Sequence, residues 1–252
     1  QTSYSSFMEF IQLFPNSPLV STAYFWIGKS AGNLKRNDEA LTNFKRSREL
    51  NPKSDIGISS TIELANLYTG KKEFSQAINI LKETAALVPT SNRIPELLFL
   101  LGGNEAKNGN NSDALSTFDQ IITYYDGNVF SSKAKIEAGK IELLNKNYSK
   151  ADEYFREVAE KRTDDIGAEA QYQLGILLYE QNKIQEAITS FVRVRSVYSG
   201  YDEWYTNSLL RLGDCYVKIK DKKLAREMYR AVLTRHTSGP FAEEAKRKIN
   251  RL

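Results

Sequence analysis

The sequence has few of the residues on which most protein chemistry depends. It contains one cysteine, Cys215, so no disulfide can form within the chain. It contains one histidine, His236, which excludes a histidine cluster that would hold zinc. Proline is scarce, with six residues in 252, and this favours long helices because proline breaks helix interiors. No apolar run approaches the roughly 18 residues that a membrane-crossing helix needs.

Patterns typical of a catalytic centre are also missing. No glycine-rich loop has the spacing that cradles phosphate, because Gly102 and Gly103 fall inside a helical pattern. The acidic pairs Asp164–Asp165 and Asp202–Glu203 stand where helices are expected to begin, and negative charge there suits the helix dipole. Cys215 lies inside an expected helix, where a small buried thiol is the simplest interpretation. We therefore expect a protein that is not an enzyme and that binds no cofactor and no metal.

Charge of the two signs is balanced along most of the chain. The 35 Lys and Arg residues and 31 Asp and Glu residues give a net charge of +4 and a pI near 8.9. The signs are interleaved, as in Glu39–Glu49 and Lys150–Arg162, and basic clusters such as Lys246–Lys248 are short. These runs are typical of solvated helix faces, so no nucleic-acid partner is expected.

The main signal is an internal repeat. Six alanines recur at intervals of 37, 37, 37, 36 and 38 residues, at Ala40, Ala77, Ala114, Ala151, Ala187 and Ala225. A large apolar residue follows each alanine by four positions, at Phe44, Leu81, Phe118, Phe155, Phe191 and Tyr229. A small residue precedes each alanine by twelve positions, at Gly28, Ala65, Gly102, Gly139, Gly175 and Gly213.

Each of these positions has a physical role. Spacings of three and four place the alanine and the large residue on one helix face. The small residue and the alanine are expected where two helices cross, because only a small side chain lets two backbones approach closely. Turn residues such as Asn108–Asn111 separate the two helices of each repeat. Each repeat is thus predicted to be an antiparallel helical hairpin.

This pattern resembles the tetratricopeptide repeat family, whose consensus has a Trp-x2-Leu-Gly-x2-Tyr helix, an Ala-x3-Phe helix and a closing Pro. The first repeat matches it at Tyr24, Ile27, Gly28, Ala31, Ala40, Phe44 and Pro52. The closing proline occurs only at Pro15, Pro52 and Pro89. The resemblance covers essentially the whole chain and implies an all-α fold, a right-handed α-solenoid of antiparallel helix pairs.

The register of the repeat sets the expected boundaries of a single solenoid domain over residues 1–252. Six repeats are expected at 18–52, 54–89, 91–126, 128–163, 164–199 and 201–237. Residues 1–15 are expected to form the second helix of a truncated repeat, and residues 240–252 a charged capping helix, since terminal repeats need a polar outer face. The apolar edge of the truncated repeat, with Phe7, Phe10 and Ile11, could mediate self-association through this open end.

The long junctions between repeats, such as Phe14–Pro18, resemble those of bacterial cell-envelope members of the family. Among these are the outer-membrane assembly lipoprotein BamD and the Tol-associated periplasmic protein YbgF. The resemblance implies a non-catalytic scaffold or adaptor in an envelope assembly, periplasmic or associated with the outer membrane. The alternatives are a cytosolic co-chaperone or regulatory module, and the non-catalytic arm of a larger enzyme. Because the sequence opens at Gln1 in an amphipathic stretch, we expect a fragment or a processed product.

In this family the first helix of each repeat lines a concave face that binds partners, and solenoids commonly bind on such a surface. The resemblance places a set of inward positions on this face: Phe25, Lys29, Ile62, Asn66, Phe99, Lys133, Ile136, Lys140, Tyr172, Ile176, Tyr179, Leu210 and Asp214. These are the predicted groove residues. The expected partner is a protein segment, either an amphipathic helix or an extended peptide.

Within this set we expect three aromatic anchors, Phe99, Tyr172 and Tyr179, because rigid aromatic residues are frequent at interaction hot spots. Three lysines could contact an acidic ligand, at Lys29, Lys133 and Lys140. Capture of a C-terminal carboxylate is not expected, because Phe25 and Lys29 do not match the Lys and Asn pair that this mode needs. The competing interpretation is that the apolar members are partly buried between neighbouring first helices.

Overall fold

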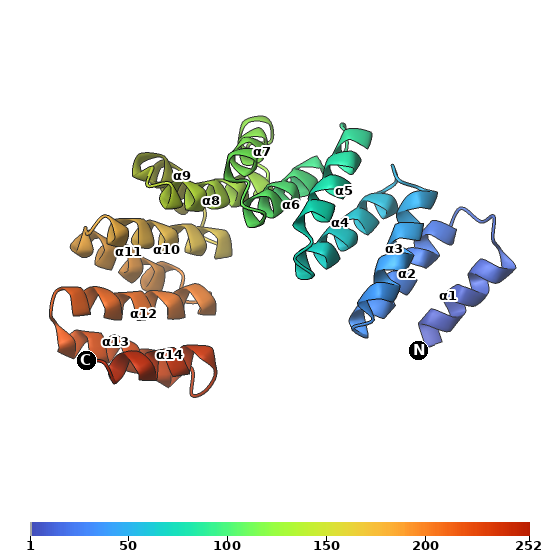
Figure 1. Ribbon diagram of the computed structural model, residues 1–252. Helices are drawn as coiled ribbons and strands as arrows, with labels where there is room; N and C mark the ends of the chain where they lie inside the picture. The colour runs from blue at the N-terminus through green and yellow to red at the C-terminus, as the bar shows by residue number, and fades with distance from the viewer. Residues whose placement is uncertain (1) are drawn as a thin grey trace. The chain divides into compact units, whose positions relative to one another are not determined.

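The computed structural model describes residues 2–252. Its described residues form fourteen helices and no strand (Figure 1), which confirms the all-α solenoid class. The helices are α1 (Thr2–Leu13), α2 (Val20–Asn33), α3 (Asn37–Leu50), α4 (Asp55–Gly70), α5 (Phe74–Leu87), α6 (Ile94–Lys107), α7 (Asn111–Tyr124), α8 (Val129–Leu144), α9 (Tyr148–Lys161), α10 (Asp165–Glu180), α11 (Ile184–Val197), α12 (Asp202–Lys218), α13 (Lys222–Arg235) and α14 (Pro240–Ile249). Within this part of the chain, no helix has both the length and the apolar composition to cross a membrane.

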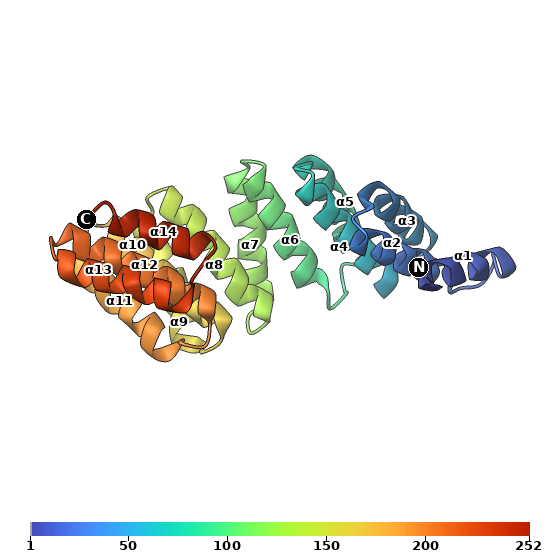
Figure 2. The same ribbon diagram turned by 90° about the horizontal axis from the view of Figure 1, so that it is seen from below.

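The helices pair as the register of the repeat predicts. The six repeats correspond to the pairs α2–α3, α4–α5, α6–α7, α8–α9, α10–α11 and α12–α13, with α1 before and α14 after them. Paired helices such as α12 and α13 contact each other and run side by side in both views (Figures 1 and 2). The chain divides into two compact units, one ending at Ser131 and one formed by Ser132–Leu252. That the repeats act as one domain stays a prediction.

Close packing of glycine against an aromatic ring holds the two helices of most repeats together. A Cβ on Gly28 would lie 2.8 Å from the Phe44 ring, and one on Gly213 would lie 2.2 Å from the Tyr229 ring. These distances leave no room for a side chain. The alanines of the second helices are fully buried, as Ala40 and Ala225 illustrate. The expected close crossing of the two helices is therefore present.

The turn between the two helices of a repeat has the same geometry in all six copies. A hydrogen bond closes the turn: a backbone N–H donates to the carbonyl of the first-helix residue five positions earlier. Examples are Arg36 N to Ala31 O at 2.9 Å and Asp221 N to Tyr216 O at 2.9 Å. This bond is typical of a helix that ends with one left-handed residue. The left-handed residues, all with positive φ, are Lys35, Lys72, Gly109, Lys146, Asn182 and Lys220.

The two ends of the described chain differ in polarity. Helix α1 packs against α2, and its Phe7 and Phe10 are half-buried there, whereas Leu13 and Phe14 are 64% and 57% exposed. Helix α14 packs against α13 through the buried Ala242 and leaves Lys246 and Arg247 exposed, whereas Lys248 is half-buried beside Asp214. This polar outer face is what the expected capping helix requires.

Candidate functional site

The apolar members of the predicted groove residues are mostly interior. Phe25, Ile136, Tyr172 and Leu210 are buried, and Phe99 is only half-buried. The same holds for Ile62, which is half-buried. The aromatic members contact the large residue of their own repeat, with ring centroids 5.6 Å apart for Phe25–Phe44, 6.1 Å for Phe99–Phe118 and 5.6 Å for Tyr172–Phe191. These side chains therefore pack within and between the repeats, as the competing interpretation expects.

The lysines of the predicted groove residues are largely neutralised. Lys29 Nζ lies 2.8 Å from Glu63 Oε1, which joins the first helices of two successive repeats. Lys140 Nζ lies 2.8 Å from Glu137 Oε1 and 2.6 Å from Glu169 Oε1. Burial alone would lower the pKa of Lys140, but the two carboxylates outweigh it and raise the pKa above its usual value. An acidic ligand would have to compete with these carboxylates.

Lys133 and Ile176 complete the predicted set in the second unit. Both residues are half-buried. They line none of the pockets described below, so the structure leaves their role as a prediction.

The first unit has a pocket on its first-helix face, which we call the asparagine pocket. Its volume is about 240 Å³, and its lining residues are Lys29, Gly32, Asn33, Asn37, Phe44, Glu63, Asn66 and Leu67. Lys29 and Asn66 are predicted groove residues, and α2, α3 and α4 supply the walls. The side chains of Asn33, Asn37 and Asn66 are exposed and make no hydrogen bond within residues 2–252. Each amide offers two donors and one acceptor oxygen.

The second unit has a pocket of about 350 Å³ on its own first-helix face, which we call the Asp214 pocket. Its lining residues are Tyr179, Asp214, Val217, Lys218, Tyr229, Lys248, Arg251 and Leu252. Asp214 Oδ1 accepts hydrogen bonds from Tyr229 Oη at 2.8 Å and from Lys248 Nζ at 2.6 Å. Burial and this bond raise the pKa of the Tyr229 hydroxyl. The Asp214 carboxylate therefore connects α12 to α13 and α14, and its hydrogen-bonding capacity is used within the protein.

The aromatic anchor Tyr179 lies beside Asp214 in this pocket. It is half-buried, and Lys218 Nζ stands 4.1 Å from the centre of its ring. Burial is the main cause that raises the pKa of its hydroxyl. Of the three anchors expected from the sequence, Tyr179 and Phe99 are thus partly accessible, whereas Tyr172 is buried.

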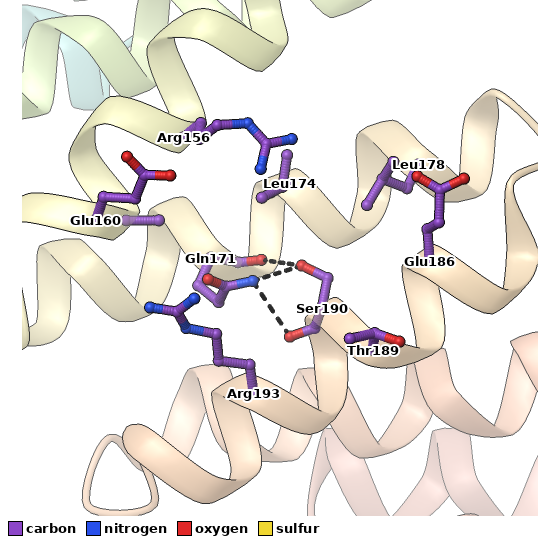
Figure 3. A pocket seen from close by; sticks show the side chains of 10 residues that line it. Arg156, Glu160, Gln171, Leu174, Leu178, Glu186, Thr189, Ser190 and Arg193 are labelled. Carbon is purple, nitrogen blue, oxygen red and sulfur yellow. Dashed lines mark hydrogen bonds between the residues drawn. The ribbon is translucent and has the colours of Figure 1, made fainter.

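A third pocket lies where α9, α10 and α11 meet in the second unit, and no predicted groove residue lines it. Its volume is about 280 Å³. Figure 3 shows Leu174 and Leu178 in this pocket, with Arg156 and Arg193 from different helices beside them. Asp152 holds the Arg156 guanidinium through two hydrogen bonds of 3.0 and 2.8 Å. In the sequence these arginines are indistinguishable from other charges on solvated helix faces, so no signal marked this pocket.

The single cysteine and the single histidine both have structural contacts. The Cys215 side chain is fully buried, which raises the pKa of its thiol to about 12 and keeps it protonated. His236 Nε2 lies 2.9 Å from Thr206 Oγ1, and its ring contacts Phe241 with centroids 5.1 Å apart. Within the described residues no group of three or more His, Cys, Asp or Glu side chains is placed to hold a metal ion.

Comparison with known families agrees with these repeats. A family model described as a tetratricopeptide repeat-like domain matches residues 102–252, and a tetratricopeptide repeat model matches residues 22–54. The chain belongs to the tetratricopeptide repeat family. No curated protein sequence matches it. Repeats of this family generally form non-catalytic protein-interaction scaffolds, and neither matching model describes a catalytic domain.

Solved structures share the fold at low sequence identity. A tetratricopeptide repeat protein from Parabacteroides merdae is 18% identical with a TM-score of 0.68, and the match covers 98% of this chain and 90% of that one. PilW, a widely conserved type IV pilus biogenesis factor, is 13% identical with a TM-score of 0.67, covering 90% and 98%. PilF from Pseudomonas aeruginosa is 16% identical with a TM-score of 0.61, covering 90% and 97%.

Proposed function

We propose that the chain is a non-catalytic adaptor that holds a segment of a partner protein on the first-helix face of its repeats. The observation that carries this proposal is the asparagine pocket, where the side chains of Asn33, Asn37 and Asn66 are exposed and without hydrogen bonds inside the described chain. Polar groups that converge on a pocket and have no internal partner are available to a ligand.

The chemistry of the pocket favours an extended peptide. An asparagine amide can donate to a peptide carbonyl and accept from a peptide N–H at the same time. Lys29 and Glu63 neutralise each other at 2.8 Å, so the pocket has little net charge to attract a strongly acidic or basic segment. The Phe44 ring and the half-buried Leu67 give it an apolar wall. We infer recognition of peptide backbone combined with one apolar side chain.

We further propose that the adaptor works in a bacterial cell-envelope assembly, in the periplasm or at the outer membrane. The long junctions between repeats support this, since they resemble those of envelope members of the family. The shared fold with a type IV pilus biogenesis factor points in the same direction.

The test is crosslinking capture from a bacterial envelope extract, with wild type, Asn33→Ala/Asn66→Ala and Thr189→Ala/Arg193→Ala compared side by side. The first variant removes two side-chain amides from the asparagine pocket. The second changes the pocket of Figure 3 and serves as a matched control. Tyr172→Ala is unsuitable, because Tyr172 is buried between Phe191 and Trp204 and its loss would unsettle the fold.

The proposal expects a partner that wild type and the control variant recover and that the asparagine variant loses. Circular dichroism must show that all three chains stay folded. Equal recovery by all three chains contradicts the proposed site, and loss only with Thr189→Ala/Arg193→Ala transfers the function to the pocket of Figure 3.

A further inference from the structure

Lysine gathers on one edge of the second unit. First helices α10 and α12 contact each other and run in the same direction, so the turns that follow them lie on the same edge (Figure 1). We define the turn edge as Leu144–Asn147, Glu180–Lys183 and Val217–Lys223. It carries six lysines, at 146, 183, 218, 220, 222 and 223, against the two carboxylates Glu180 and Asp221.

Most of this positive charge is not neutralised within the protein. The side chains of Lys146, Lys183, Lys220 and Lys223 are exposed and form no ion pair or hydrogen bond within residues 2–252. Asp221 is engaged in capping α13, where its Oδ1 accepts from Leu224 N at 2.9 Å. The edge therefore presents a local excess of cations.

The fold itself does not require lysine at these turns. Lys146 and Lys220 adopt φ of 61° and 64°, in the left-handed region that favours glycine and asparagine. The equivalent turns in the third and fifth repeats hold Gly109 and Asn182, whereas those in the first and second repeats hold Lys35 and Lys72, so the turn accepts lysine without requiring it.

Aliphatic side chains stand among these lysines. Leu144 is 76% exposed, and Val217 and Ile219 are 44% and 47% exposed in the α12–α13 turn. Val217 and Ile219 alternate in sequence with Lys218 and Lys220. The edge thus combines exposed apolar tips with surrounding cations.

We propose that the turn edge docks on the surface of an anionic lipid bilayer. Lysines near such a surface are attracted to lipid phosphates, and aliphatic side chains gain by entering the boundary between headgroups and acyl chains. A nucleic acid would use the lysines but would leave the aliphatic tips in water. This surface is separate from the asparagine pocket, so the proposal goes beyond the adaptor function.

The test is co-sedimentation of the full chain with vesicles of phosphatidylcholine, alone or mixed with phosphatidylglycerol. Three variants are compared with wild type: Lys220→Asn/Lys223→Gln, Ile219→Ser and Arg193→Gln/Arg230→Gln. The arginine pair is the matched control, because it removes the same charge from exposed positions of α11 and α13 that are about two helical turns or more from the turn edge.

Wild type is expected to bind the anionic vesicles and not the phosphatidylcholine vesicles. Loss of two lysines is expected to weaken binding about 25-fold, at about fivefold for each lysine at the surface. Ile219→Ser should weaken it several-fold at unchanged charge, and the arginine control by less than about threefold, since distant charges are screened.

Three results would overturn the proposal. They are binding of wild type to neither vesicle, a loss of affinity in the arginine control as large as that in the lysine variant, and unchanged vesicle binding in Ile219→Ser. Binding of an oligonucleotide through the same lysines, with no vesicle binding, would assign the edge to nucleic acid instead.

Discussion

The two pockets on the first-helix faces differ in how their polar groups are used. In the asparagine pocket of the first unit, the side chains of Asn33 and Asn66 are exposed and lack hydrogen bonds within the described chain. In the Asp214 pocket of the second unit, the Asp214 carboxylate already serves Tyr229 and Lys248. The same position of the repeat, held by Asn66 and by Asp214, therefore leaves a side chain unpaired in one copy and holds the capping helix in another.

The two units also differ in the buried residues at one position of the repeat. Three residues after the large apolar residue, the first two repeats have the buried hydroxyls Ser47 and Thr84, whereas repeats in the second unit have the valines Val194 and Val232. Thr84 Oγ1 lies 3.0 Å from Thr61 Oγ1. At this position the first two repeats thus use buried hydrogen bonds and these repeats of the second unit use apolar contact, although the second unit buries the hydrogen-bonded pair Gln171–Ser190 elsewhere.

The largest expected effect comes from breaking the Asp214 network. Asp214→Ala leaves the Tyr229 hydroxyl and the Lys248 ammonium without their shared partner in a site where the Asp214 side chain is only 15% exposed. We expect the free energy of unfolding to fall by about 3 kcal/mol, the lower end for removing one partner of a buried pair. Urea denaturation measures it, and a fall no larger than that of Asn66→Ala would contradict the structural role of Asp214.

The reactivity of the Cys215 thiol is a local measure of the destabilisation caused by Asp214→Ala. In wild type we expect negligible reaction with a thiol reagent, because the thiol is buried and burial raises its pKa to about 12. In Asp214→Ala the labelling rate should rise about 100-fold, since easier opening exposes the thiol and one negative neighbour is lost. The rate is followed by absorbance or mass spectrometry. Rapid labelling of wild type would show that α12 is less tightly packed than described.

A hydroxyl placed among the buried valines of the second unit should lower the free energy of unfolding by less than Asp214→Ala does. Val194→Thr replaces a methyl group by a hydroxyl at a fully buried position, and we expect a loss of about 1–2 kcal/mol in the free energy of unfolding. The measurement is again urea denaturation. No loss would mean that the second unit accepts hydroxyls as readily as the first, and the contrast between the two cores would disappear.

The reciprocal change in the first unit should have the smallest effect on stability. Thr84→Val removes the partner of Thr61 Oγ1, but Thr61 still donates to Gly57 O at 3.1 Å. We expect a change of less than about 1 kcal/mol of either sign in the free energy of unfolding. A loss as large as that of Asp214→Ala would show that the hydroxyl pair is essential to the first unit.

The fold was predictable because its main contacts are local and periodic. The glycine beneath each aromatic ring, as at Gly28 and Gly213, is imposed by the close helix crossing, so it recurs at a fixed spacing that the sequence displays. The starts of two helices were predictable from the acidic pairs: α10 begins at Asp165 and α12 at Asp202.

The site was predictable only in part, because its chemistry depends on pairs between repeats. Nothing in the local sequence of Lys29 shows that Glu63, one repeat later, neutralises it. Asn66 was expected on the first-helix face, but Asn33 and Asn37 come from the end of α2 and the start of α3, outside the positions that the family pattern marks. Burial of Tyr172 likewise depends on Trp204 in the next repeat.

The most direct test of the adaptor function is hydrogen exchange of the chain with and without its captured partner. Our account predicts slower exchange in α2 and α4, which carry Asn33 and Asn66, and unchanged exchange in α9 and α11, which border the pocket of Figure 3. Protection confined to α9 and α11, with none in α2 and α4, would contradict binding on the first-helix face.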